Sequence, residues 1–166
     1  LENKTVGIIG LGKIGNKTAN LFNAFGCKVL AYQRKPINNP NVTQVTLDEL
    51  LSQSDIISLH IPYNEETYHF IDEDKINMMK KDAILINCAR GAVVDNIALA
   101  KALNEERIKG AGIDVFDYEP PLNADYPLLN AKNTILTPHL AYFTKEAMIK
   151  RANIEFNNVI EYLKKQ

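Results

Sequence analysis

The chain has 166 residues, of which 46% are hydrophobic and 23% charged, and its formal net charge is −1 at pH 7. This length fits one domain of ordinary globular composition. The nearly neutral charge excludes a general electrostatic attraction to nucleic acid or anionic membranes, and no apolar run is long enough to span a bilayer.

The first half of the chain alternates short apolar runs with helical patterns. Residues 6–9 form a nearly all-apolar run, as expected for a strand that is covered on both faces. A helix is predicted over 13–25 and ends at Gly26, because glycine is favoured just beyond a helix C-terminus. Further elements are strands at 29–32, 42–45 and 56–59, and a helix at 47–52 with Thr46 and Glu49 as a capping box.

The second half predicts helices over 72–79, 96–106 and 145–164, and strands over 83–86, 110–115 and 134–136. The helix over 96–106 places Leu99, Ala100 and Leu103 inside. The last helix is expected to bury one apolar stripe: Met148, Ala152, Phe156, Val159, Ile160 and Leu163. Strands that alternate with helices predict an α/β fold of the Rossmann type, a doubly wound parallel sheet of about seven strands in three αβα layers. Right-handed crossovers then place the carboxyl ends of the strands, and the ligand, at one edge.

The two cysteines, Cys27 and Cys88, form no CxxC pattern, and no signal-peptide pattern precedes the first strand. Such thiols fit a reducing compartment better than a disulfide framework. We therefore expect a cytoplasmic protein, and we assign no residue to a metal.

A glycine-rich loop, Gly-Leu-Gly-Lys-Ile-Gly, follows the first strand and begins the first helix. Its glycines allow a tight turn, a close approach of the backbone to a pyrophosphate and close packing of helix on strand. The helix N-terminus adds free amides and the positive end of a dipole. We predict dinucleotide contacts from Gly10, Gly12, Lys13, Ile14 and Gly15, although a glycine-rich turn without ligand is the alternative.

The residue expected to bind the ribose 2′-hydroxyl is an acid about 20 positions further on. Gln33 occupies that place, and Arg34 and Lys35 follow it. Glutamine does not repel a 2′-phosphate, and the two cations can attract one. The sequence therefore predicts NAD or NADP as cofactor, with NADP tolerated or preferred. Alternatively, Arg34 and Lys35 are solvated charges at a turn.

Reduction of a 2-oxo acid needs a cation for the substrate carboxylate, a proton donor and a group that sets the pKa of that donor. Arg90 follows the fifth predicted strand, and its planar guanidinium suits a carboxylate. His139 ends the seventh strand, and its imidazole titrates near neutrality. Glu119 lies in the loop after the sixth strand, where a carboxylate beside the imidazole would raise its pKa. Of two rival histidines, His60 is expected to line the cofactor cleft and His69 to face solvent.

These ordered motifs resemble the nucleotide-binding domain of the D-isomer-specific 2-hydroxyacid dehydrogenases. The resemblance covers essentially the whole chain, and its motifs lie at 4–10, 54–62, 87–95, 112–120 and 136–139. It implies that Arg90 binds the substrate, that His139 is the acid/base and that Glu119 is its partner. It also implies a cofactor cleft lined by His60, Pro62, Thr67, Cys88, Ala89, Arg90, Asp114, His139 and Ala141.

The resemblance further implies an oxidoreductase that transfers a hydride between NAD(P)H and a small 2-oxo acid to give a D-2-hydroxy acid. Residues 1–166 would be its dinucleotide-binding domain, and the substrate domain of the intact enzyme would be absent from this chain. We expect little turnover from this domain alone, and a homodimer, because relatives commonly dimerise through it. The alternative is a nicotinamide-dependent binding or sensor module, as in corepressor relatives of the family.

Overall fold

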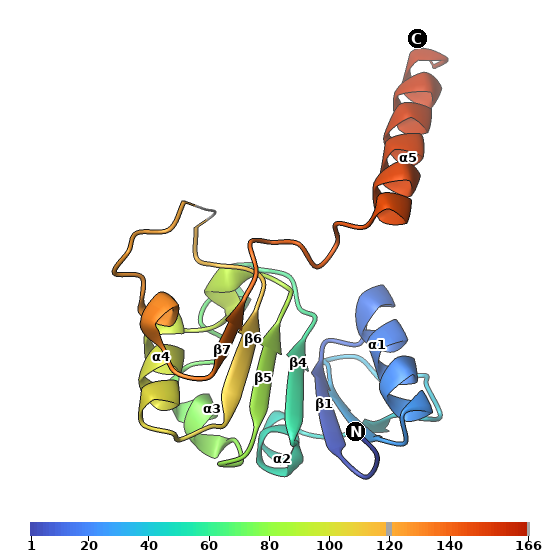
Figure 1. The fold of residues 1–166 in the computed structure, drawn as a ribbon. Helices are drawn as coiled ribbons and strands as arrows, with labels where there is room; N and C mark the ends of the chain where they lie inside the picture. The colour runs from blue at the N-terminus through green and yellow to red at the C-terminus, as the bar shows by residue number, and fades with distance from the viewer. Residues whose placement is uncertain (119–120, 166) are drawn as a thin grey trace.

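The structure is a computed structural model that describes residues 1–118 and 121–165. Seven parallel strands form one sheet in the order β3-β2-β1-β4-β5-β6-β7 (Figure 1), which confirms the predicted fold. The strands are β1 (Thr5–Ile9), β2 (Lys28–Tyr32), β3 (Thr43–Gln44), β4 (Ile56–Leu59), β5 (Ile84–Asn87), β6 (Gly110–Ile113) and β7 (Thr134–Leu136). The α-helices are α1 (Lys13–Ala24), α2 (Leu47–Gln53), α3 (Glu73–Met78), α4 (Asn96–Asn104) and α5 (Lys145–Leu163). Three short 3₁₀ turns, which the sequence did not predict, are η1 (Glu65–Thr67), η2 (Gly91–Val93) and η3 (Pro127–Asn130).

The sheet separates two apolar clusters. On one face α1 packs on β1 and β2, and Ala19 of the helix belongs to a buried cluster with Val6, Ile8 and Val29. On the other face α2, α3 and α4 cover the strands, with Leu50, Leu99 and Leu103 completely buried. Burial of Leu99, Ala100 and Leu103 confirms the predicted inner face of α4.

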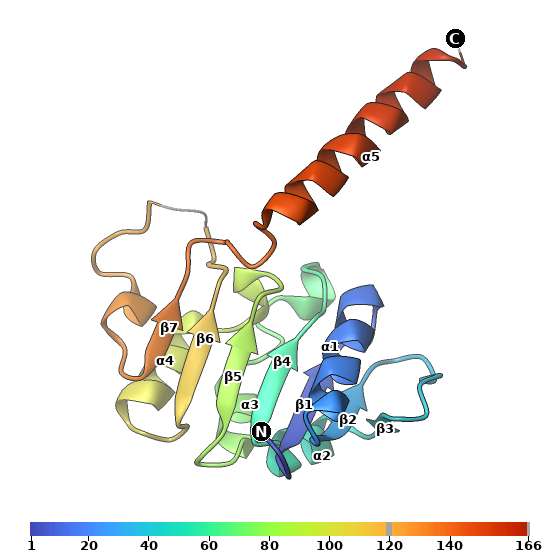
Figure 2. The ribbon, with the colours of Figure 1, turned by 45° about the vertical axis from the view of Figure 1, so that its right-hand side comes forward.

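The order of the strands creates a switch point between β1 and β4. The chain runs outward from β1 to β3 and then returns to pair β4 with the other side of β1. Loops that leave β1 and β4 at this point diverge to opposite faces, which opens a crevice at their carboxyl ends. Figure 2 shows that the carboxyl ends of all the labelled strands lie at the same edge of the sheet.

Local capping explains where two of the helices begin and end. The side chain of Thr46 accepts from the amide of Glu49, and the Glu49 carboxylate accepts from the amide of Thr46 at 2.9 Å, which confirms the capping box. Gly26 has a φ of 76°, a left-handed conformation that glycine adopts without strain, just beyond α1.

Helix α5 contradicts its prediction. None of its residues is buried: Met148 and Ala152 are half-buried, and Phe156, Val159, Ile160 and Leu163 are exposed. The helix projects from the sheet (Figures 1 and 2), so no element of residues 1–118 or 121–144 covers its apolar stripe. Amphipathic periodicity shows that a helix has an apolar face, but it does not show that the same chain supplies the cover. None of the described helices is long and apolar enough to cross a membrane.

Candidate nucleotide and active site

The glycine loop after β1 forms a cradle with open space at its centre. Gly10 has a φ of 93°, and a Cβ there would lie 2.7 Å from the carbonyl oxygen of His60. A Cβ on Gly15 would overlap the carbonyl oxygen of Gly10. A Cβ on Gly12, in contrast, would meet no atom within 4 Å, and its φ of −73° suits any residue. The fold therefore requires Gly10 and Gly15, whereas Gly12 leaves room for a ligand.

Helix α1 presents its N-terminus to this space. Gly12 is its N-cap, no side chain caps it, and its first turn contains no acidic residue. Its first amides are thus available to an anion, and the helix dipole favours a negative charge there. Lys13 and Ile14 lie exposed at the same turn. These features fit the diphosphate of a dinucleotide.

A cleft beside the cradle gathers predicted cofactor residues from the segments after β1, β2 and β4. Its lining includes Gly10, Gln33, Arg34, Pro62 and Thr67. The Gln33 side chain donates to the carbonyl oxygen of Lys35 at 3.0 Å, so it stabilises its own turn. Lys35 is not part of the described lining of this cleft.

The cleft wall formed by residues after β4 is internally braced. The Thr67 hydroxyl donates to the carbonyl oxygen of Pro62 at 2.7 Å, and Asn64 and Thr67 cap η1 reciprocally. The ring of His60 forms a 3.0 Å hydrogen bond with the hydroxyl of Ser58, and burial lowers the pKa of His60 below its usual value. A lowered pKa keeps this imidazole neutral at pH 7.

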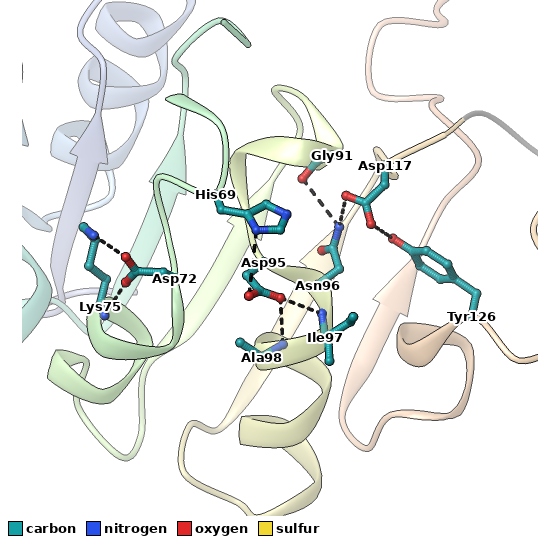
Figure 3. Close-up of polar contacts among 10 residues, drawn as sticks. All are labelled: His69, Asp72, Lys75, Gly91, Asp95, Asn96, Ile97, Ala98, Asp117 and Tyr126. Atoms are coloured by element: carbon teal, nitrogen blue, oxygen red, sulfur yellow. Dashed lines mark hydrogen bonds and ion pairs between the residues drawn. The ribbon is translucent and has the colours of Figure 1, made fainter. Parts of the chain in front are cut away.

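His69 differs from its prediction. Its side chain is half-buried rather than solvent-facing, with its ring stacked on Tyr68 at 4.0 Å between centroids. Its Nδ1 lies 3.8 Å from the carboxylate of Asp95, which also accepts from the amides of Ile97 and Ala98 at the start of α4 (Figure 3). His69 therefore lies beside the carboxylate that caps α4.

The turn after β5 presents Arg90. Asn87, which is completely buried, accepts from the amide of Ala89 and donates to the carbonyl oxygen of Arg90, both at 3.0 Å. The guanidinium of Arg90 is exposed and donates to the carbonyl oxygen of Ala89 at 2.6 Å. Cys88 is exposed too, and desolvation with the nearby Asp114 carboxylate raises the pKa of its thiol. Cys88 is therefore protonated at neutral pH and is not poised as a nucleophile.

Asp114, directly after β6, organises the segment that contains His139. One carboxylate oxygen accepts from the Thr137 hydroxyl at 2.5 Å and the Leu140 amide at 2.7 Å, and the other accepts from the Ala141 amide at 2.9 Å. Desolvation alone would raise the pKa of Asp114, but these hydrogen bonds and the charge of His139 hold the pKa below its usual value. The carboxylate is therefore ionised at neutral pH and acts as an internal anchor.

Backbone hydrogen bonds connect these strand ends in series. The amide of Asp114 donates to the carbonyl oxygen of Asn87 at 3.0 Å, and the amide of His139 donates to that of Asp114 at 2.8 Å. His139 has a φ of 55°, which is costly for a residue with a side chain and is held by these contacts. Its ring meets Tyr142 edge to face at 5.6 Å. The segments that contain Arg90, Asp114 and His139 thus form one hydrogen-bonded edge.

A second network joins the Arg90 turn to the loop after β6 (Figure 3). The side-chain amide of Asn96 donates to the Asp117 carboxylate at 2.8 Å and lies 3.5 Å from the carbonyl oxygen of Gly91. The hydroxyl of Tyr126 donates to the other Asp117 oxygen at 3.0 Å. A Cβ on Gly91 would overlap the backbone of Phe116, so the two segments touch directly. Glu119 lies outside the described residues.

The sequence analysis assigned no role to four residues that help to build this site: Glu66, Asn87, Asn96 and Asp117. An asparagine at the end of a strand can close a turn with its own backbone, which is a detectable signal for Asn87. Glu66 accepts a hydrogen bond from Arg34, 32 residues away, and Asp117 accepts one from Asn96, 21 residues away, so local patterns could not reveal these contacts.

Comparison with known proteins shows that the chain is similar to one family of dehydrogenases. A family model described as "D-isomer specific 2-hydroxyacid dehydrogenase, NAD binding domain" matches residues 1–141. A glyoxylate reductase from Thermofilum pendens is 46% identical over 169 residues, which cover 99% of this chain and 50% of that protein. The chain therefore spans about half the length of this relative.

Solved structures show the same likeness. A D-isomer specific 2-hydroxyacid dehydrogenase from Lactobacillus delbrueckii ssp. bulgaricus, in its NAD-complexed form, has a TM-score of 0.89 and 35% identity, covering 97% of this chain and 53% of that one. An acyclic imino acid reductase in complex with NADPH and D-Arg has a TM-score of 0.91 and 39% identity, covering 99% and 52%.

Proposed function

Because this chain belongs to the D-isomer-specific 2-hydroxyacid dehydrogenases as their NAD-binding domain, we propose that its protein reduces a small 2-oxo acid to a D-2-hydroxy acid. The main support for this proposal is the series of hydrogen bonds that joins Asn87, Asp114 and His139 at the carboxyl edge of the sheet. Arg90 and His139 therefore follow β5 and β7, on either side of the loop after β6, at the same edge of the sheet as the glycine cradle. Reduction of a 2-oxo acid needs a cation for the substrate carboxylate and a proton donor for the new hydroxyl group at such an edge.

Each residue has a distinct role in this proposal. Arg90 binds the substrate carboxylate and polarises the carbonyl, because its guanidinium is exposed at the end of a fixed turn. His139 donates a proton to the alkoxide oxygen that forms on reduction. Glu119 is assigned, on the sequence alone, as the carboxylate that favours the protonated imidazole. A bound nicotinamide would supply the hydride.

The cofactor site accepts NADH and, we propose, NADPH. The open space at Gly12 and the uncapped start of α1 fit a diphosphate. Gln33 carries no charge where an acidic residue would repel a 2′-phosphate, and Arg34 lines the same cleft. One solved relative is in complex with NADPH and another is in an NAD-complexed form, which supports a site that takes either cofactor.

The substrate pocket is, in our proposal, completed by a segment outside these 166 residues. The support is the length of the relatives, of which this chain spans about half. That segment would read the substrate side chain, and this chain would supply the cofactor domain. A homodimer stays a prediction from the family resemblance.

The test is reduction of glyoxylate, pyruvate and hydroxypyruvate by the intact protein, with a His139→Gln variant and His69→Gln as the matched control. We expect kcat to fall about 100-fold or more in His139→Gln, while NADH binding is retained. His69→Gln should keep kcat within about threefold, because its partly exposed contact with Asp95 lies outside the hydrogen bonds that join Asn87, Asp114 and His139. Unchanged turnover in His139→Gln would remove this residue from the mechanism. NADH binding without reduction of any 2-oxo acid would instead support a nicotinamide-dependent binding module.

A further inference from the structure

The cleft beside the glycine cradle is spanned by an ion pair. Arg34, two residues after β2, places a guanidinium nitrogen 2.7 Å from a carboxylate oxygen of Glu66 in η1. Both residues line the same cleft as Gln33. A 2′-phosphate that bound at Gln33 would therefore meet a cation that already has a carboxylate partner.

Two independent contacts hold the members of this pair face to face. The reciprocal cap between Asn64 and Thr67 fixes η1, and with it the backbone of Glu66. The ring of Tyr32, the last residue of β2, stacks on Phe70 at 6.2 Å between centroids, which joins the two walls of the cleft. Glu66 is thus positioned opposite Arg34 by the fold rather than by the ion pair alone.

The ion pair itself is weak, because its side chains are 79% and 70% exposed. A dianionic phosphate can therefore displace the carboxylate of Glu66 from Arg34. To do so, it would have to break the ion pair and approach the negative charge of Glu66. A ribose 2′-hydroxyl carries no charge and meets neither obstacle. The same pair thus treats the two cofactors differently.

We propose that Glu66 is a specificity-determining residue that competes with the 2′-phosphate for Arg34 and so reduces the preference for NADPH. The inference rests on the proposed nicotinamide-binding role of this cleft. It assigns the cofactor preference to a balance between Gln33, which admits the phosphate, and Glu66, which retains the cation.

The test is a titration of the protein with NADPH and with NADH at one ionic strength, followed by nicotinamide fluorescence. Glu66→Gln keeps the size of the side chain and removes its charge. We expect it to tighten NADPH binding about threefold to fivefold, as expected for loss of an exposed competing ion pair. NADH affinity should stay within about twofold, which also reports that the variant is folded.

Two further variants separate competition for Arg34 from a general charge effect. Glu65→Gln removes the same charge from the neighbouring position of η1, where the described residues provide no cation partner. Its effect on NADPH affinity should therefore be smaller than that of Glu66→Gln. Combining Glu66→Gln with Arg34→Ala should abolish the gain, because no cation is left to release.

The outcomes distinguish the two levels of the proposal. If the unaltered protein binds neither nucleotide, the proposed cofactor role itself fails. If it binds NADH but Glu66→Gln leaves the ratio of NADPH to NADH affinity unchanged, the role of Glu66 is overturned. An equal gain in Glu65→Gln, or a gain that persists without Arg34, would also overturn it.

Discussion

The two halves of the carboxyl edge are held by different kinds of contact. At the ends of β5 and β6, and at the start of α4, buried residues with specific hydrogen bonds, Asn87, Asp114 and Asn96, fix the loops. At the ends of β2 and β4, the exposed pair Arg34–Glu66 meets across an open cleft. Reacting groups must be held within a fraction of an ångström, whereas cofactor choice is adjusted by exposed charges at little cost in stability.

The largest effect on stability should come from adding one methyl group where the loops after β5 and β6 meet. Gly91→Ala places a Cβ in the backbone of Phe116, so the Arg90 turn and the loop after β6 must separate. We expect a loss of about 3 kcal/mol or more in the free energy of unfolding, measured by urea denaturation. Gly26→Ala is the comparison, since it strains only a helix terminus with a φ of 76° and should cost about 1 kcal/mol. Equal losses would show that the contact between the two loops is not tight.

Asp114→Asn should have the next largest effect. Asp114 is 3% exposed and both of its carboxylate oxygens accept hydrogen bonds, so an amide NH₂ in place of one oxygen faces a donor. We expect a loss of about 2 kcal/mol at pH 7, measured by urea unfolding. Asp82→Asn, at an exposed position, should leave the free energy of unfolding within about 0.5 kcal/mol. An equally small change in Asp114→Asn would contradict the role of an anchor.

The same residue predicts a pH dependence. The pKa of Asp114 is lowered in the folded protein from its ordinary value of 3.8, so the unfolded chain binds the proton more readily. Its stabilisation is therefore fully present above about pH 4 and is lost as the pH falls through the lower folded pKa. Unfolding free energies measured from pH 6 down to pH 3 should fall less steeply in Asp114→Asn than in the parent. Parallel curves would contradict the lowered pKa.

Local patterns were sufficient for the fold. The apolar run at β1, the glycine beyond α1 and the Thr46–Glu49 cap each depend on residues close in sequence, and each was predicted. Helix α5 shows the limit of such patterns. Its apolar periodicity predicts burial, but no element of the described residues covers it.

The candidate site was predictable where chemistry follows directly from residue type. The glycine loop, Arg90 and His139 were found from their places at strand ends, and the structure brings those ends to one edge. The supporting contacts were not predictable. Asn96 and Asp117 are 21 residues apart and Arg34 and Glu66 are 32 apart, so only the folded chain makes them neighbours.

Tyr126→Phe should have a smaller effect on the free energy of unfolding. The variant keeps the ring that packs edge to face on Phe116 and removes the hydroxyl that donates to Asp117 at 3.0 Å. We expect a loss of about 1 kcal/mol in the free energy of unfolding, because a single hydrogen bond is removed and Asp117 keeps its bond from Asn96. In an Asp117→Asn background the same substitution should cost measurably less. An identical cost in both backgrounds would show that the effect does not come from the hydrogen bond between Tyr126 and Asp117.

Gly12→Ala should have the smallest effect on stability and a large effect on binding. A Cβ at Gly12 meets no atom within 4 Å, and the φ of −73° suits alanine, so the free energy of unfolding should change by less than about 0.5 kcal/mol. The methyl group would nevertheless occupy the space in which the amides of α1 approach a diphosphate, and NADH affinity should fall about tenfold or more. Paired unfolding and NADH titrations separate the two effects. Unchanged affinity would mean that the open space at Gly12 does not receive the diphosphate, because a methyl group there has nothing else to contact.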